Sequence, residues 1–184
     1  IEQKKLKLSG KHNVANTLAA LALGDAAKIP MASMLEALKV FSGLPHRTQF
    51  VAKKHNVTWI NDSKGTNVGA TIAAIDGVQV KNKLLLIAGG LAKDADFTAL
   101  KSVVKDKVRS VVLIGKDAPK IEQALQDDVP IWFAKDMQDA VNMSADLAHP
   151  EDTVVLSPAC ACFDQFNGYE HRGEVLGKAG EDLL

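Results

Sequence analysis

From about residue 48 onward, short apolar runs alternate with segments whose apolar residues recur at helical spacing. The apolar runs, each typical of a β-strand, cover residues 48–53, 57–60, 84–88, 111–114, 131–133 and 154–156. The segments with helical spacing cover residues 68–75, 97–104, 118–125, 137–147 and 170–183. This alternation predicts an α/β fold with a doubly wound, mostly parallel sheet. The first two strands are only a few residues apart, so we expect them to form a hairpin at one edge.

The first 43 residues follow a different pattern. A polar stretch, residues 10–16, leads into a strongly apolar helix predicted over residues 17–27, and after Pro30 a second helix is predicted from about residue 32 to 41. The first of these helices is apolar nearly all round, so we expect it to be buried on several sides. Two helices cannot supply that cover alone. We therefore expect this part to be the tail of a larger domain, with a boundary at residues 43–47.

Composition narrows the class of protein. The chain has 184 residues, of which 47% are hydrophobic and 24% charged, as in an ordinary globular protein. Its 22 basic residues balance 22 acidic ones, so we expect no nucleic-acid partner. No apolar run is long enough to span a membrane and no signal peptide is visible, which predicts a cytoplasmic protein with no membrane partner. Because the first residue is Ile rather than Met, we expect a piece of a longer protein.

Three polar turns follow predicted strands. They cover residues 61–67, 89–94 and 157–164. In an open parallel sheet, ligands collect beyond the carboxyl ends of the strands, and helix starts there offer free N–H groups to anions. The turns contribute Lys64 and Lys93, hydroxyl groups, and small residues that permit close approach of the backbone. The pattern predicts a receptor for a carboxylate or a phosphate.

Each turn also has an explanation that needs no ligand. Gly89-Gly90 can be turn geometry, and Thr66 or Asn67 can cap the next helix. The two lysines can be solvated surface side chains. Only the coincidence of the turns on one predicted sheet edge favours a site.

Several chemical motifs are absent from the sequence. No GxxxxGK[ST] or GxGxxG motif occurs, and Ser157 lacks the flanking glycines of a nucleophile elbow. The five histidines show no metal-ligand spacing, and Cys160 and Cys162 are too close together for an ordinary disulfide. No metal site is predicted in this chain, and two free thiols fit a reducing compartment.

Five motifs in order along the chain resemble the Mur ligases of bacterial peptidoglycan synthesis. They are Gly10-x-His12-Asn13-x-x-Asn16, Leu44-Pro45-His46-Arg47, Asn61-Asp62-Ser63-Lys64-Gly65-Thr66-Asn67, Gly89-Gly90 with Lys93, and Leu156-Ser157-Pro158-Ala159-Cys160-Ala161. The segments Phe163-Asp164-Gln165-Phe166 and Tyr169-Glu170-His171-Arg172-Gly173 are similar to the member of that family that adds D-glutamate. The resemblance covers essentially the whole chain.

The resemblance implies a three-domain enzyme of which this chain is the last part. Residues 1–43 would be the C-terminal end of the central ATP-binding domain, and residues 44–184 the Rossmann-like C-terminal domain that binds the amino acid. The P-loop, the uridine site and the Mg²⁺ ligands would all lie upstream of the chain. These 184 residues alone would therefore be inactive, and the whole enzyme is expected to be a monomer.

The reaction implied by the resemblance joins D-glutamate to UDP-N-acetylmuramoyl-L-alanine. ATP activates the substrate carboxylate as an acyl phosphate, the D-glutamate amine attacks it, and phosphate and ADP are released. Lys64 and Arg47 would be the catalytic residues. Carried over by position, the implied contacts are Asn13 and Asn16 with the adenine side of ATP, Arg47 with its phosphates, Asp62 with the ribose or adenine, Lys64 with the phosphates or the reacting group, and Thr66, Lys93, Cys162, Phe163 and Tyr169 with D-glutamate.

Three positions depart from the family pattern. Cys162 stands where Ser is common, and a thiol is a poorer hydrogen-bond donor than a hydroxyl. Gly65, where Ala is common, and Tyr169, where Phe is common, are milder changes. Two other functions stay open from the sequence. One is another ATP-dependent ligase of the superfamily, of the Mur or folylpolyglutamate type, although no Asp-Asn-Pro-Arg motif of the diaminopimelate-adding member occurs. The other is a stand-alone α/β module that binds a small anion, which predicts no exposed apolar face in residues 1–43.

Overall fold

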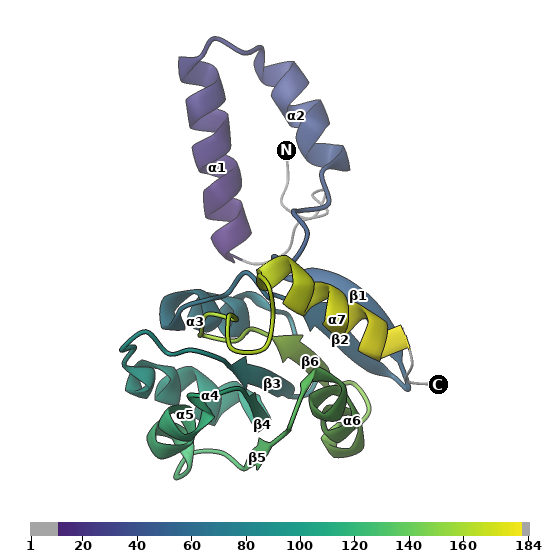
Figure 1. Ribbon diagram of the computed structural model, residues 1–184. Coiled ribbons are helices and arrows are strands. Elements are labelled where there is room, and N and C mark those ends of the chain that lie inside the picture. Colours follow the sequence, from purple (N-terminus) through teal and green to yellow (C-terminus); the bar gives the residue numbers. More distant parts are fainter. Residues whose placement is uncertain (1–10, 182–184) are drawn as a thin grey trace.

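The computed structural model describes residues 11–181, which form a six-stranded sheet covered by helices and a helical hairpin that stands apart from it (Figure 1). The hairpin consists of α1 (Lys11–Ala26) and α2 (Met31–Val40). The strands are β1 (Gln49–Lys54), β2 (Val57–Asn61), β3 (Leu84–Gly89), β4 (Val108–Ile114), β5 (Ile131–Phe133) and β6 (Thr153–Leu156). The remaining helices are α3 (Val68–Gly77), the 3₁₀ helix η2 (Phe97–Leu100), α4 (Lys101–Lys107), α5 (Ala118–Leu125), α6 (Met137–Leu147) and α7 (Tyr169–Glu181).

The strand order is β1-β2-β6-β3-β4-β5. Only the β1–β2 pair is antiparallel, and every other neighbouring pair is parallel. The predicted α/β class, the mostly parallel sheet and the hairpin at one edge are therefore confirmed. The order matters for the site, because β6 returns from the end of the chain to lie between β2 and β3. The carboxyl ends of β2, β6 and β3 are consequently neighbours.

The sheet is buried on both faces because its central strands carry continuous apolar runs, residues 84–88 in β3, 111–114 in β4 and 154–156 in β6. In β3, Leu84 and Leu86 pack into the layer beneath α3, α4 and α5, whereas Leu85 and Ile87 pack beneath α6 and α7. The same alternation continues in β4 and β6. A continuous apolar run bounded by turns is the signature of a parallel strand covered on both sides. Figure 1 shows the two helical layers on opposite faces of the sheet.

Some predicted boundaries are wrong by a few residues. α1 begins at Lys11 rather than at residue 17, so Asn13 and Asn16 lie on the helix and not in a turn before it. Asn is only a weak helix breaker, and no Gly or Pro stands in that stretch to stop the helix. β4 begins at Val108, three residues before the predicted start at 111. The predicted end of the last helix at residue 183 lies outside the described residues.

The helical hairpin exposes much of its apolar surface. Leu18 is 62% exposed and Leu23 is 73% exposed, and α2 contains no buried residue. The expectation that the first helix is buried on several sides is therefore not met within the described chain. A self-contained module with no exposed apolar face in its first 43 residues is also contradicted. The division into two domains at residue 43 stays a prediction.

Asp152 ties the far end of the sheet together, at the start of the parallel strands. Its buried carboxylate accepts two hydrogen bonds from the Arg109 guanidinium, at 2.6 and 3.1 Å, and others from the backbone N–H groups of Lys83 and His149. Burial raises the pKa of the Asp152 carboxyl, but Arg109 and the two amides lower it further, so the net pKa lies below its ordinary value. These contacts join β3, β4 and β6 before the strands run toward the opposite edge.

We predict that Asp152→Asn lowers the free energy of unfolding by about 2 kcal/mol or more, because Arg109 loses its buried carboxylate partner. The lowered pKa means that this stabilisation is complete above the ordinary value of 3.8 and is lost as the pH falls through the folded-state pKa. Urea unfolding at pH 7 and at a series of acidic pH values measures both effects. The matched control is Glu151→Gln at the adjacent, more exposed position, which we expect to change stability little. Equal loss of stability in the two variants would contradict the assignment.

Candidate functional site

The three polar turns meet at the carboxyl edge of the sheet, as the sequence predicted. The Gly65 carbonyl accepts a hydrogen bond from the Ala159 N–H at 2.9 Å, which joins the first turn to the third. Leu91 and Ala161 exchange two backbone hydrogen bonds, which join the second turn to the third. The turn that follows β6 therefore lies in the middle and is bonded to both of its neighbours.

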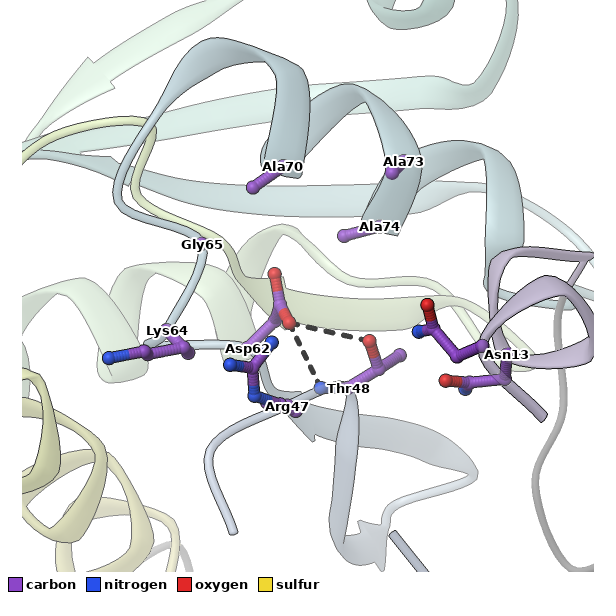
Figure 2. A pocket seen from close by; sticks show the side chains of 10 residues that line it. Asn13, Arg47, Thr48, Asp62, Lys64, Gly65, Ala70, Ala73 and Ala74 are labelled. Carbon is purple, nitrogen blue, oxygen red and sulfur yellow. Dashed lines mark hydrogen bonds between the residues drawn. The ribbon is translucent and has the colours of Figure 1, made fainter. Parts of the chain in front are cut away.

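A cleft of about 240 Å³ opens beside the first turn, between it, α1 and α3. Figure 2 shows Asn13 on one side, the alanines of α3 above, Asp62 and Arg47 near the middle, and Lys64 on the side away from Asn13. Its lining residues are Asn13, Asn16, Arg47, Thr48, Asp62, Lys64, Gly65, Ala70, Ala73 and Ala74. The small side chains of α3 leave an apolar wall with room for a flat group. The two cations and the amides suit a ligand with negative charge and several polar atoms.

Asp62 is largely buried at the base of this cleft and holds two segments together. Its Oδ1 accepts hydrogen bonds from the Thr48 N–H at 3.0 Å and the Thr48 hydroxyl at 3.3 Å, and its Oδ2 accepts one from the Ser157 hydroxyl at 2.7 Å. Gly65 leaves the space for this arrangement, because a Cβ there would lie 2.5 Å from Asp62 Oδ2 and 2.6 Å from Ser157 Oγ. Asp62 therefore positions Thr48 and Ser157 relative to the first turn, a role that the sequence did not predict.

Thr48 lies in the segment that joins the helical hairpin to the sheet. Its φ of 46° falls in the left-handed region, which is unfavourable for a β-branched residue. The two hydrogen bonds from Thr48 to Asp62 hold this conformation. Because Arg47 directly precedes Thr48, the same contacts fix where the Arg47 backbone enters the cleft.

Lys64 and Tyr169 lie together although they are far apart in sequence. The Lys64 Nζ is 3.6 Å from the centre of the Tyr169 ring, within the range of a cation–π contact. Figure 2 shows that Lys64 extends away from Asn13. A hydrogen bond to Glu170 raises the pKa of the Tyr169 hydroxyl. The ammonium thus lies between the cleft and the first turn of α7.

The other predicted site residues lie outside the lining of this cleft. Thr66 is half-buried in the first turn, Lys93 is exposed in the second, and Cys162 is buried in the third. Phe163 is 69% exposed. The hydrogen bonds between the turns bring these segments to one edge of the sheet. The structure therefore divides the predicted residues into two groups. The cleft group is Asn13, Asn16, Arg47, Asp62 and Lys64, and the edge group is Thr66, Lys93, Cys162, Phe163 and Tyr169. The groups meet where Lys64 lies beside Tyr169.

Some of the explanations that need no ligand also hold. Asn67 caps α3, because its side chain accepts a hydrogen bond from the Ala70 N–H. Gly89 and Gly90 have φ values of 121° and 128°, and a Cβ at either would lie about 2 Å from a carbonyl oxygen of a neighbouring segment, at 1.9 and 2.1 Å respectively. Glycine is required at both positions by packing alone.

Sequence reasoning missed Asp117, which shapes the second turn from outside it. The Asp117 carboxylate accepts a hydrogen bond from the Ala92 N–H at 2.9 Å, and its own N–H donates to the Gly90 carbonyl at 3.0 Å. The Ala92 amide and the ammonium of Lys120 lower the pKa of this carboxyl. Asp117 follows β4 at the same sheet edge as the other turns. A polar residue directly after a predicted strand was the sequence feature that could have identified it. Lys93, next to Ala92, has a φ of 46° and is held there by these contacts.

Arg172 is the other residue that was missed. In the sequence it stands out only as part of a motif, yet it is completely buried and contacts both the first and the third turn. Nearby, burial raises the pKa of the Cys160 thiol to about 12, so this sulfur stays a neutral thiol at physiological pH. A buried, neutral thiol is a poor nucleophile.

No group of three or more metal-ligating side chains occurs among residues 11–181. Over the same residues, no helix combines the length and apolar character that crossing a membrane requires. The arrangement can bind anionic groups through Arg47, Lys64 and Lys93, and it can orient them through backbone and side-chain hydrogen bonds.

Comparison with known proteins finds relatives of this chain. The family model described as "Mur ligase, glutamate ligase domain" matches residues 46–160, more than half of the chain. A UDP-N-acetylmuramoylalanine–D-glutamate ligase of Nitrosococcus oceani is 48% identical over all 184 residues. The protein of the same name from Coxiella burnetii is 52% identical over 182 residues, or 98% of this chain. The chain spans 41% of the length of each of these relatives.

The solved structures agree on the fold. The UDP-N-acetylmuramate–alanine ligase of Thermotoga maritima superimposes with a TM-score of 0.71 at 17% sequence identity. The match covers 97% of this chain and 40% of that protein. At this level of identity the match concerns the path of the backbone, including the helical hairpin, and not the choice of ligand.

We predict that Asp117→Ala loosens the second turn without unfolding the sheet. The Ala92 N–H loses its acceptor, so its hydrogen exchange should accelerate by about tenfold or more, whereas amides of β3 and β4 should keep their protection. Lys120→Ala is the matched control, because it removes the 2.9 Å ion pair of Asp117 but leaves the Ala92 hydrogen bond in place. Amide exchange followed by NMR resolves these sites. Unchanged exchange at Ala92 would show that Asp117 does not hold the turn.

Proposed function

The chain belongs to the Mur ligase family, and on that premise we propose that it is the C-terminal part of a cytoplasmic ligase that adds D-glutamate to UDP-N-acetylmuramoyl-L-alanine at the expense of ATP. The observation that carries the proposal is the high identity to D-glutamate ligases along essentially the whole chain, 48% and 52% in the two relatives described above. The motifs at the sheet edge fall within that matched length. A fold match alone would not distinguish D-glutamate from other amino acids.

The cleft beside the first turn is assigned to ATP. Asn13 and Asn16 would contact the adenine, whose flat ring fits against the alanines of α3. Asp62, at the base of the cleft, would accept a hydrogen bond from the ribose or adenine. Arg47 would bind the phosphates. This orientation of the nucleotide is supported by Figure 2, in which Lys64 lies on the side away from Asn13 and Arg47 lies between them.

The edge group is assigned to D-glutamate. Thr66 and Lys93 would bind its carboxylates, since a hydroxyl and an ammonium are suitable donors to that group. Cys162, Phe163 and Tyr169 would enclose the rest of the amino acid. The position of Tyr169 under Lys64 supports a junction at which the amino acid meets the transferred phosphoryl group.

The chemistry requires positioning and charge stabilisation more than a protein nucleophile. ATP transfers its γ-phosphoryl group to the substrate carboxylate, and the resulting acyl phosphate is attacked by the neutral amine of D-glutamate. The tetrahedral intermediate then expels phosphate and leaves the amide. Lys64 and Arg47 would stabilise the negative charge on the phosphoryl oxygens during both steps. No group of three or more metal-ligating side chains occurs in the described part of the chain, and no step through Mg²⁺ is assigned to it.

The helical hairpin is assigned to the central ATP-binding domain. Its exposed apolar residues are Leu18, Leu23, Ile29, Met31, Val40 and Phe41. A surface of this kind is unusual for a helix that faces only water. The rest of the central domain would cover it, and domain closure would bring the acyl phosphate to the edge group.

The decisive experiment uses the full-length protein that contains this chain. We predict ATP- and UDP-N-acetylmuramoyl-L-alanine-dependent release of phosphate with D-glutamate, and none above background with L-glutamate, L-alanine, diaminopimelate or a folate substrate. The chain of 184 residues alone should show no turnover, although weak binding of ADP or D-glutamate can persist. Turnover with another amino acid in place of D-glutamate would overturn the assignment of substrate.

A second prediction concerns Cys162. We expect Cys162→Ser to lower the KM for D-glutamate by about threefold to tenfold, because a hydroxyl is a better donor to a carboxylate than a thiol. Cys162→Ala, which has no donor at all, is the matched control and should not improve the KM. Steady-state kinetics of the full-length protein measures both. An unchanged KM in both variants would assign the contact at this position to the backbone instead.

A further inference from the structure

Arg172 is an unusual buried cation. Its side chain is 0% exposed, and within residues 11–181 no carboxylate oxygen lies within 4.0 Å of its guanidinium to form an ion pair. Burial lowers the pKa of this group, the direction expected when a cation leaves water. Burying a charge without a paired counter-charge is costly, so the hydrogen bonds that Arg172 makes are the reason to look for a role.

The side-chain hydrogen bonds of Arg172 go to two turns of the proposed site. The Nε–H donates to the Ser63 hydroxyl at 2.9 Å, and Nη2 donates to the Ser63 carbonyl at 2.8 Å. Nη1 makes a longer contact of 3.4 Å with the Cys160 carbonyl. One rigid guanidinium on α7 therefore contacts the turn after β2 and the turn after β6.

The contacts with Ser63 fix Lys64 from two directions. The Ser63 carbonyl belongs to the peptide group that precedes Lys64, so its hydrogen bond to Arg172 orients the Lys64 backbone. The Ser63 hydroxyl, which accepts from Arg172, donates to the Tyr169 carbonyl at 2.8 Å. Tyr169 in turn supports the Lys64 ammonium with its ring, at 3.6 Å. Backbone and ammonium of Lys64 are thus both set by the network around Arg172.

The contact with Cys160 extends the same network to the edge group. Cys160 lies two residues before Cys162 and next to Ala161, which carries the hydrogen bonds to Leu91 in the second turn. A shift of the Cys160 carbonyl would therefore move the backbone on which both Cys162 and the second turn depend. Arg172 itself contacts neither the cleft nor solvent.

We propose that Arg172 is the positioning residue that couples the two halves of the site, setting Lys64 on the phosphoryl side and the turn around Cys162 on the D-glutamate side. The inference rests on the proposed function. The feature that suits Arg to this task is its planar fork, which donates to several acceptors in fixed directions, whereas a lysine ammonium cannot hold both turns at these positions.

The test compares Arg172→Lys with wild type in the full-length protein. We expect the KM for D-glutamate to rise by about tenfold or more and kcat to fall by a similar factor. The reason is that Lys64 and the turn around Cys162 would both lose their fixed positions. A merely structural role predicts something different: a smaller active fraction, which lowers the apparent kcat but leaves the KM unchanged. Thermal unfolding of each variant and the measured active fraction separate the two.

Ser63→Ala provides a second route that keeps Arg172 in place. It removes the hydroxyl between the Arg172 Nε–H and the Tyr169 carbonyl with a minimal change of volume, and we expect the KM for D-glutamate to rise about threefold to tenfold. Arg109→Lys is the matched control, an arginine at the opposite end of the sheet that pairs with Asp152. It should lower stability but leave the KM unchanged.

Two failures would be distinguishable. If wild type shows no D-glutamate-dependent release of phosphate, the proposed function fails. If wild type is active and the KM for D-glutamate is unchanged in Ser63→Ala, and in Arg172→Lys where that variant folds, the positioning role of Arg172 is overturned.

Discussion

The site depends on the position of one strand. β6 comes last in the sequence but lies between β2 and β3 in the sheet, so three turns that are far apart in the chain end side by side. Parallel pairing makes this possible, because all three strands present their carboxyl ends to the same edge. The Asp152–Arg109 contact holds the opposite end of the sheet, where these strands begin. The geometry of the edge is therefore a consequence of the pairing throughout the sheet.

Within that frame, a few polar groups set the detailed shape. Asp62 links the turn after β2 to the linker from the helical hairpin, and Asp117 holds the turn after β3. Arg172 ties the turns after β2 and β6 to α7. These residues are more deeply placed or more fully bonded than the cations proposed to meet the ligands. Lys93, for instance, is exposed on a backbone that Asp117 shapes from outside. The proposed site thus combines accessible charged side chains with hydrogen-bonded residues behind them that fix the turns.

Much of the fold was predictable because the pattern of apolar residues follows directly from it. A run such as Leu84–Gly89, apolar at almost every position, is typical of a strand in the middle of a sheet that is covered on both faces. The three turns were predictable for the same reason, as polar segments at strand ends. The start of α1 was not, because Asn13 and Asn16 are polar residues whose helical state depends on weak propensities. Arg172 and Asp117 were missed because their importance lies in contacts across the chain. Nothing in local sequence marks a charged residue as completely buried.

In the proposed enzyme, this chain supplies both a nucleotide contact and the D-glutamate contacts of one reaction site, and the two meet at Lys64. A crystal structure of the full-length protein with ADP and D-glutamate bound tests it most directly. We expect the adenine beside Asn13 and Asn16, the phosphates near Arg47, and the D-glutamate carboxylates within hydrogen-bond distance of Thr66 and Lys93. Binding of D-glutamate away from the turns after β2, β6 and β3 would contradict it.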